Sequence, residues 1–203
     1  IIGPCSADKQ DSVLDYTNRL ANLQEEVKEN ILIIPRIYTS KPRTTGTGYK
    51  GLLHNPNADK KEDLFKGVIA SRELHLKVIK ETGFYCADEM LYPEEIYYFM
   101  DLLAYMAVGA RSVENQGHRM VASGVNIPIG LKNPISGSKD SLVNSILASQ
   151  ASHHMIYRSW EVKCEGNPFA HAILRGFINN SGKHIPNYHY EDLMRLYDLY
   201  SKK

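Results

Sequence analysis

The feature of this sequence that most constrains its fold is a regular alternation of short apolar runs with longer segments of helical periodicity. The apolar runs predict strands at residues 1–2, 31–38, 84–87, 107–111, 127–132 and 171–175. The remaining periodic segments predict helices at residues 11–29, 62–81, 93–106, 118–123, 137–150 and 190–200. Strand-then-helix units repeated in one direction predict an α/β fold, in which helices cover a parallel sheet. A doubly wound sheet and a (β/α)₈ barrel both satisfy this pattern.

Two segments depart from this alternation of predicted strands and helices. Residues 155–158 and 160–163 alternate apolar and polar side chains, which predicts an inserted antiparallel hairpin near 153–164. Residues 39–61 are polar and Gly-rich, which predicts a long loop after the second strand. Within it, residues 46–51 match the dinucleotide-binding pattern GxGxxG, but we reject that reading because no amphipathic helix begins after the last glycine. We expect these glycines to let the loop approach a ligand closely.

Composition narrows the class of protein. The chain has 203 residues, 43% of them hydrophobic, and a net charge of +1. The length predicts one globular domain over residues 1–203, or at most two small ones, and the charge disfavours a basic nucleic-acid binder. No apolar run approaches the length of a membrane span, and three cysteines are too few for a disulfide scaffold. We therefore expect a cytoplasmic protein with no nucleic-acid or membrane partner. The sequence opens on Ile1 without an initiator Met, so we expect a piece of a longer protein.

Charged side chains follow the predicted strands. In chain order they are Arg36, Lys41 and Arg43 after the second strand, Glu89 after the third, Arg111 after the fourth, Lys132 after the fifth and Arg175 after the sixth. In a barrel the carboxyl ends of all strands meet on one face, so these groups would share one cleft. So many cations predict a substrate with several negative charges, most simply phosphates. The alternative is that each cation pairs with an acidic residue at a helix start.

Cys5 follows the first predicted strand. A buried cysteine is most often a small apolar filler, but the neighbouring cations would favour a thiolate, which can ligate a metal. None of the histidines has a ligand spacing with Cys5, so the sequence supplies one plausible metal ligand and no complete set.

A set of ordered motifs identifies a family resemblance. The motifs are Gly3-Pro4-Cys5-Ser6, Arg36-Ile37-Tyr38, Lys41-Pro42-Arg43-Thr44-Thr45, Gly109-Ala110-Arg111-Ser112-Val113-Glu114-Asn115-Gln116, Gly130-Leu131-Lys132-Asn133, Ile173-Leu174-Arg175-Gly176 and Pro186-Asn187-Tyr188. Together they resemble the class I 3-deoxy-D-arabino-heptulosonate 7-phosphate (DAHP) synthases, also called phospho-2-dehydro-3-deoxyheptonate aldolases. The resemblance covers essentially the whole chain, and the Lys-Pro-Arg-Thr-Thr sequence is its most specific part.

The resemblance implies a fold, a reaction and a set of residue roles. The fold would be a (β/α)₈ TIM barrel, with about six of the eight units present here. The enzyme would condense phosphoenolpyruvate (PEP) with erythrose 4-phosphate, releasing phosphate, in the first step of the shikimate pathway to aromatic amino acids. The implied PEP-binding residues are Arg36, Glu89, Arg111, Lys132 and Arg175. Those implied for the aldose phosphate are Lys41, Pro42, Arg43 and Thr44. Arg36, Lys41 and Lys132 would be catalytic, and Cys5 would ligate a divalent metal ion, one of Mn, Fe, Co and Zn.

Two further expectations follow from the resemblance. The intact protein would be a homo-oligomer, and the family's other metal ligands lie on barrel strands that this chain does not contain. We therefore expect the 203-residue chain alone to be inactive. One alternative is a truncated, non-catalytic paralogue that binds phosphometabolites or a partner subunit. Another is a different PEP-dependent aldol synthase, such as 3-deoxy-manno-octulosonate 8-phosphate synthase, although those enzymes usually carry an Ala-Asn-Arg type sequence after the lysine.

Overall fold

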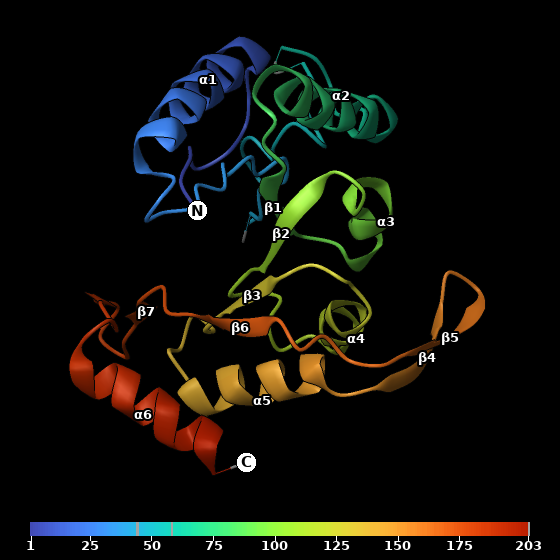
Figure 1. Cartoon of the computed structure of the whole chain (residues 1–203). Coiled ribbons are helices and arrows are strands. Elements are labelled where there is room, and N and C mark those ends of the chain that lie inside the picture. Colours follow the sequence, from blue (N-terminus) through green and yellow to red (C-terminus); the bar gives the residue numbers. More distant parts are fainter. Residues whose placement is uncertain (44, 58, 203) are drawn as a thin grey trace. The chain divides into compact units, whose positions relative to one another are not determined.

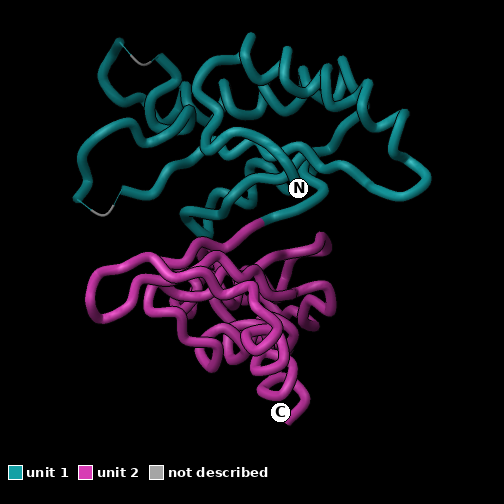
Figure 2. The backbone as a smooth tube through the Cα atoms, turned by 90° about the vertical axis from the view of Figure 1, so that its left-hand side faces the viewer, with its two compact units in different colours: residues 1–106 teal, residues 107–203 magenta. Residues whose placement is uncertain are grey.

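The computed structural model describes residues 1–43, 45–57 and 59–202. The chain divides into two compact units, Ile1–Met106 and Ala107–Lys203, drawn in different colours in Figure 2. Helices and strands alternate along both units, as Figure 1 shows. The predicted α/β class is thereby confirmed, whereas closure into a barrel and the single-domain assignment stay predictions. None of the described helices is both long enough and apolar enough to cross a membrane.

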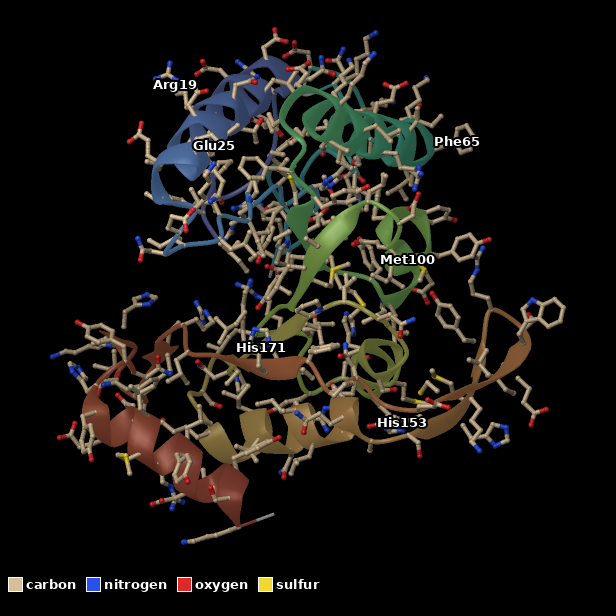
Figure 3. All side chains as sticks on the ribbon, viewed as in Figure 1. Arg19, Glu25, Phe65, Met100, His153 and His171 are labelled. Carbon is tan, nitrogen blue, oxygen red and sulfur yellow. The ribbon has the colours of Figure 1, made fainter. Side chains whose placement is uncertain are left out.

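The first unit contains two long helices and the first strands. Its elements are α1 (Gln10–Val27), α2 (Leu64–Thr82), β1 (Cys86–Met90), η1 (Pro93–Glu95), α3 (Ile96–Phe99) and β2 (Leu103–Val108), which runs past the unit boundary. Helices α1 and α2 pack side by side over apolar residues that include Ile37, Leu74 and Val78. The outer face of α1 carries charged side chains such as Arg19 and Glu25 (Figure 3). Helix α1 is therefore amphipathic, as predicted.

The predicted strand at 31–38 forms only in its second half. Isolated parallel bridges join Ile2 to Pro35 and Arg36 to Ala87, so residues 35–37 lie between the start of the chain and β1. Ile31 and Leu32 are exposed, and the amide side chain of Gln24 binds this stretch by accepting from the Ile33 N–H and donating to the Ile31 carbonyl. Pro35 has no N–H, which shortens the ladder further. The strand prediction is therefore wrong for 31–34.

Two neighbouring predictions were displaced. The helix expected at 93–106 ends at Phe99, and the strand expected at 107–111 begins at Leu103. Nearly all of β2 is buried, and a short apolar run of that kind fits a buried strand as well as a buried helix. The strand expected at 84–87 forms as β1, Cys86–Met90, and so begins two residues later than predicted. Helix α2 before it ends at Gly83, which lies in the left-handed region at φ 76°. Glu89 therefore lies within β1 and does not follow it.

The second unit continues the alternation. Its elements are α4 (Gln116–Ser123), β3 (Ile129–Lys132), α5 (Lys139–Gln150), β4 (His153–Tyr157), β5 (Trp160–Cys164), β6 (Ala170–Ile173), β7 (Phe177–Ile178), β8 (His184–Ile185) and α6 (Tyr190–Ser201). Strands β3 and β6 pair in parallel, with Ile129 opposite Ala170 and Lys132 opposite Ile173. Helix α5 follows β3 and packs against β6, α4 and α6. This is the strand–helix–strand arrangement that the sequence predicts.

The inserted hairpin is confirmed as β4 and β5, which pair in antiparallel register from His153–Cys164 to Tyr157–Trp160. Its turn residues, Arg158 and Ser159, have φ values of 50° and 66°. Two consecutive left-handed residues match the twist of a two-residue hairpin turn. The second hairpin, β7 with β8, was not predicted, because strands of two residues are too short to show an alternating pattern.

Candidate active site

In the first unit, the cations after the second predicted strand gather around Cys5. The Lys41 ammonium donates a hydrogen bond to the Cys5 thiol, with 2.5 Å between Nζ and Sγ. Arg36 Nη2 donates to the Cys5 carbonyl at 3.1 Å. The hydrogen bond from Lys41 is the largest effect and lowers the pKa of the Cys5 thiol; burial opposes it, and the charges of Lys41, Arg36 and Arg43 lower the pKa further, so that the net shift is downward. The site therefore favours a Cys5 thiolate, as the sequence indicated.

The placement of Arg36 depends on close packing around its backbone and side chain. A Cβ at Gly3 would lie 2.3 Å from the Arg36 carbonyl oxygen, so only glycine lets the first segment pass this closely. The Arg36 guanidinium lies over the Tyr38 ring, 3.8 Å from its centroid. Burial raises the pKa of Tyr38 above its usual range, and the nearby Glu89 carboxylate adds to the effect. Arg36, Tyr38 and Glu89 are thus neighbours at this end of the site.

The Gly-rich loop folds back on itself. The Lys41 N–H donates to the Lys50 carbonyl at 2.8 Å, and the Leu53 N–H donates to the Thr39 carbonyl at 3.0 Å. Gly51 has φ 96°, and a Cβ there would lie 2.3 Å from the Thr39 oxygen. The close approach made by this glycine is therefore to the loop's own backbone.

Arg43 is held within the same loop. Its Nε donates to the Tyr49 carbonyl at 2.7 Å, and Gly48, at φ 88°, faces the guanidinium. In the described residues, Arg36, Lys41 and Arg43 contact carbonyl oxygens and a thiol, which disfavours the alternative that they serve as ion-pair partners for helix starts. Thr44, also assigned to the aldose phosphate, lies outside the described residues.

Two buried carboxylates in this unit were missed by the sequence analysis. Asp88 on β1 accepts hydrogen bonds from the backbone and hydroxyl of Thr39, and Glu95 in η1 accepts one from the Ser40 hydroxyl. Both acids are at least nine-tenths buried. The signal that could have found Asp88 is its position inside the apolar run Cys86–Met90, where a charged residue needs partners.

In the second unit, two asparagines fix the turn after β6. The Asn133 side-chain oxygen accepts from the Arg175 N–H and from the Asn187 side-chain amide, both at 3.0 Å. The Asn187 oxygen accepts from the Gly176 N–H at 2.7 Å, and Asn133 Nδ2 donates to the Gly176 carbonyl at 2.9 Å. Neither asparagine was assigned a role from the sequence, although both lie in its motifs.

This arrangement places Lys132 and Arg175 at the same edge of the sheet. Lys132 is the last residue of β3, and Arg175 follows β6, whose last residue, Ile173, lies opposite Lys132. Arg111 comes three residues after the end of β2. The proposed sharing of one cavity by Arg36, Arg111, Lys132 and Arg175 joins residues of both units and stays a prediction.

A cavity lies beside the Arg175 turn. Its volume is about 470 Å³, and it is lined by Leu174, Arg175, Gly176, Phe177, His184, Ile185, Pro186, Asn187 and Tyr188. Arg175 carries a permanent positive charge in this lining, and the unpredicted β7–β8 hairpin contributes Phe177, His184 and Ile185 to it. The cavity is therefore suited to an anionic ligand.

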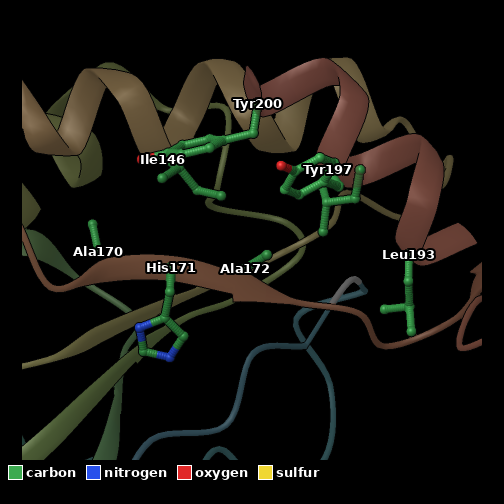
Figure 4. Close-up of a pocket in the computed structure, with 8 residues that line it drawn as sticks. Ile146, Ala170, His171, Ala172, Leu193, Tyr197 and Tyr200 are labelled. Atoms are coloured by element: carbon green, nitrogen blue, oxygen red, sulfur yellow. The ribbon is translucent and has the colours of Figure 1, made fainter. Parts of the chain in front are cut away.

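A second cavity of the same unit has a different chemistry. Its volume is about 400 Å³, and it is lined by Ile146, Ala170, His171, Ala172, Leu193, Leu196, Tyr197 and Tyr200 (Figure 4). In that view His171 points to the side of β6 opposite Ile146 and Tyr200. The walls are mainly apolar and aromatic, so this cavity does not fit a phosphate.

The residues described do not fit a complete metal site. A structural or catalytic metal ion needs at least three protein ligands, and no cluster of three or more His, Cys, Asp or Glu side chains suits a metal within the described ranges. Cys5 remains a single candidate ligand, with a thiolate favoured by Lys41.

The chain is similar to proteins of one known family over nearly its whole length. The family model for the DAHP synthetase I family matches residues 1–199. The tyrosine-inhibited phospho-2-dehydro-3-deoxyheptonate aldolase of Candida albicans is 37% identical over 198 residues, which are 95% of this chain and 52% of that protein. The Tyr-sensitive enzyme of the same name from Escherichia coli is 37% identical over 93% of this chain and 52% of its own length.

The solved structures contain a similar fold. The structure of phospho-2-dehydro-3-deoxyheptonate aldolase from Francisella tularensis SCHU S4 matches with a TM-score of 0.90 and 32% sequence identity, covering 100% of this chain and 59% of that one. This chain thus spans about half the length of the curated relatives it matches.

Proposed function

The chain belongs to the DAHP synthetase I family, and from that premise we propose that the protein that carries it condenses PEP with erythrose 4-phosphate to give DAHP and inorganic phosphate. The observation that supports this most directly is the gathering of Arg36, Lys41 and Arg43 around Cys5, at the end of a parallel-paired segment. Such a cluster suits two phosphorylated substrates held side by side.

The two substrates would use different residues. Arg36, Arg111, Lys132 and Arg175 would neutralise the carboxylate and phosphate of PEP, and Glu89 would lie beside them. Lys41 and Arg43 would bind the aldose phosphate, with Pro42 limiting the backbone freedom between them and Thr44 completing the set. The guanidinium groups can each make bidentate contacts to a phosphate, whereas the ammonium groups act as point charges.

The bond changes follow from the substrates. PEP C3 attacks the aldehyde carbon and forms the new C–C bond, water adds at C2, and phosphate leaves with cleavage of its C–O bond. The cations would hold both anions at reacting distance, which supplies a large part of the rate enhancement. Holding Lys41 beside Cys5 would place one ammonium near the reacting carbonyl.

This chain would supply only part of the ligand set for the metal ion that the family resemblance implies. Cys5 would be one ligand, and a bound divalent ion would supply polarisation of the aldehyde. Because the described residues offer no further ligand cluster, we propose that the 203-residue chain alone is inactive. We also propose a cytoplasmic homo-oligomer. All three cysteines are free, which suits a reducing compartment.

The test is phosphate release by the full-length protein with PEP and either erythrose 4-phosphate or arabinose 5-phosphate. We expect turnover with the four-carbon aldose and little with the five-carbon one. The reverse preference would support a 3-deoxy-manno-octulosonate 8-phosphate synthase. Binding of PEP without turnover, in a protein loaded with each of Mn, Fe, Co and Zn in turn, would support the non-catalytic paralogue.

A further inference from the structure

The two residues before Lys41 have polar side chains but are almost completely buried. Thr39 and Ser40 are 1% and 2% exposed, although the chain here leaves the sheet and enters a loop. A buried hydroxyl without a hydrogen-bond partner destabilises the folded state, so a pair of buried hydroxyls calls for acceptors. Both hydroxyls are satisfied by carboxylates from a distant part of the sequence, Asp88 and Glu95.

Asp88 fixes Thr39 through both of its oxygens. Oδ1 accepts from the Thr39 backbone N–H at 2.9 Å and from the Glu89 N–H at 2.7 Å. Oδ2 accepts from the Thr39 hydroxyl at 2.6 Å, and His75 Nε2 lies 3.4 Å away. The Thr39 carbonyl meanwhile accepts from the Leu53 N–H. All three polar groups of Thr39 are therefore held, which leaves this residue little freedom.

Glu95 holds the next residue. Its Oε1 accepts from the Ser40 hydroxyl at 3.0 Å, and Oε2 accepts from the Leu91 N–H at 3.2 Å. Burial, aided by the nearby Asp88 charge, raises the pKa of Glu95 to about 8, so the two acids need not both be charged at neutral pH. Consecutive residues of one strand exit are thus each tied to their own carboxyl group.

Lys41 follows Ser40 directly, and its ammonium reaches Cys5. We propose that Asp88 and Glu95 are positioning residues, which fix Thr39 and Ser40 and thereby hold the Lys41 ammonium against Cys5. Replacing buried polar pairs by apolar ones is often neutral or favourable for stability, so stability alone gives little reason for two buried acids here. The need to place Lys41 would explain why two acids are buried here.

The proposal rests on the proposed function only where it calls Lys41 a substrate contact. The contact between Lys41 and Cys5 can be followed without any substrate. A thiol beside an ammonium is alkylated faster than an ordinary thiol, because more of it is thiolate. The rate at which iodoacetamide alkylates Cys5 therefore reports whether Lys41 is in place.

The experiment measures this rate at pH 7 in the metal-free, full-length protein, by mass spectrometry of the Cys5 peptide. The Lys41→Met variant lacks the ammonium group, so its rate of Cys5 alkylation defines the lower limit. We expect Thr39→Val, which removes one hydroxyl at nearly constant volume, and Asp88→Ala to lower the rate several-fold toward that limit. Thr39→Ser, which restores the hydroxyl, should return it to near the wild-type value. Ser40→Ala should lower it as well, through loss of the Glu95 bond.

Cys86 supplies the internal control for folding, because it is buried on β1 and should resist alkylation in every folded variant. A Thr39→Val protein that protects Cys86 and keeps the wild-type Cys5 rate would overturn the proposal. If Asp88→Ala exposes Cys86, the comparison of Thr39→Val with Thr39→Ser still decides the outcome.

Steady-state kinetics form the second arm. We expect Thr39→Val to raise KM for the aldose phosphate several-fold, with KM for PEP within twofold of wild type. If Thr39→Val lowers the Cys5 rate but leaves the aldose KM unchanged, or raises both constants together, the assignment of Lys41 as a contact of the aldose phosphate is contradicted, whereas the positioning role is decided by the Cys5 rates. A wild-type protein with no turnover would refute the proposed function, whereas the alkylation result would still stand or fall on the Cys5 rates.

Discussion

At the scale of single residues, the site is governed by where positive charge is placed and what holds it there. Arg43 is anchored through Nε to the Tyr49 carbonyl, which orients its guanidinium without using a carboxylate. An arginine held in this way keeps its charge available for a phosphate, and the planar group can contact two phosphate oxygens.

Replacing Arg43 tests this assignment. In the full-length protein, Arg43→Ala should raise KM for the aldose phosphate far more than KM for PEP. A lost bidentate phosphate contact costs roughly 1.5–3 kcal/mol, which corresponds to about 10- to 150-fold. Arg43→Lys is the matched control, because it keeps the positive charge but cannot make a bidentate contact. Its KM for the aldose phosphate should lie between those of the wild type and Arg43→Ala. Steady-state kinetics in which only the PEP constant changes would contradict the assignment.

A second residue-scale prediction concerns Glu95 and pH. Burial raises the pKa of Glu95 from 4.5 to about 8. Between these values the unfolded chain has lost the proton while the folded chain keeps it, so this group lowers folding stability as pH rises. The loss is at most about 1.4 kcal/mol for each pH unit in that window. Glu95→Gln replaces the titratable carboxyl by an amide that is neutral at every pH, so it avoids this loss and should gain stability relative to wild type between pH 5 and pH 8.

Urea denaturation at pH 5, 6.5 and 8 measures this difference. The gap between Glu95→Gln and wild type should be smallest at pH 5 and should widen at each step. Glu94→Gln, the exposed neighbour, is the control and should show no such trend. A gap for Glu95→Gln that is constant across the three pH values would show that Glu95 is not protonated in the folded protein.

At the scale of elements, turn geometry decides where strands begin and end. The β4–β5 hairpin turns through Arg158 and Ser159, both in the left-handed region that favours glycine. The β7–β8 hairpin has a glycine, Gly182, at φ 75° in the corresponding loop. Both hairpins therefore need a left-handed backbone conformation in the connecting loop. The β4–β5 hairpin adopts it with non-glycine residues, which costs strain, whereas the β7–β8 hairpin adopts it with a glycine, which does not.

This contrast predicts opposite effects of two substitutions. Ser159→Gly should stabilise the protein by about 0.5–1 kcal/mol, because it relieves a left-handed non-glycine residue. Gly182→Ala should destabilise it by a similar amount, about 1 kcal/mol. No atom lies within 4 Å of the position that a Cβ at Gly182 would take, so crowding would not explain a loss. Thermal and urea unfolding of both variants measure the effects, and two changes of the same sign would refute the account.

At the scale of the whole molecule, the second unit leaves apolar surface uncovered. Among the described strands, β6 pairs only with β3 and stands at the end of the sheet order. The apolar cavity between β6 and α6 opens beside Leu193, Tyr197 and Tyr200, which are 51%, 66% and 42% exposed (Figure 4). An unpaired strand edge next to apolar side chains favours association with another chain.

The polypeptide of residues 1–203, made by itself, should therefore form oligomers or aggregates. It should also show no phosphate release from PEP and erythrose 4-phosphate with added Mn²⁺, because Cys5 alone makes a weak metal site. Light scattering and a phosphate assay test both statements. Tyr197→Glu, on the exposed face of α6, should reduce the association. A monodisperse wild-type monomer that turns over both substrates would contradict this prediction.

Much of the architecture could be predicted from sequence, because it depends on local patterns. The long helices α1, α2 and α5 and the β4–β5 hairpin were all predicted close to their observed bounds. Short apolar runs were less informative. Residues 102–108 fit a helix or a strand equally well. Residues 31–34 resemble a buried strand, but Ile31 and Leu32 are exposed, and the Gln24 side chain binds the Ile31 carbonyl and the Ile33 N–H in place of a neighbouring strand.

The sequence by itself determined which chemistry-bearing residues the chain has and the α/β order of the elements that carry them. Only the tertiary structure decided which of those residues meet. Lys41 reaches Cys5, Asp88 and Glu95 hold Thr39 and Ser40, and Asn133 pairs with Asn187, each across a long stretch of sequence. Periodicity records how each segment buries its own apolar face, whereas a hydrogen bond between distant side chains depends on how the segments pack, which no local pattern encodes.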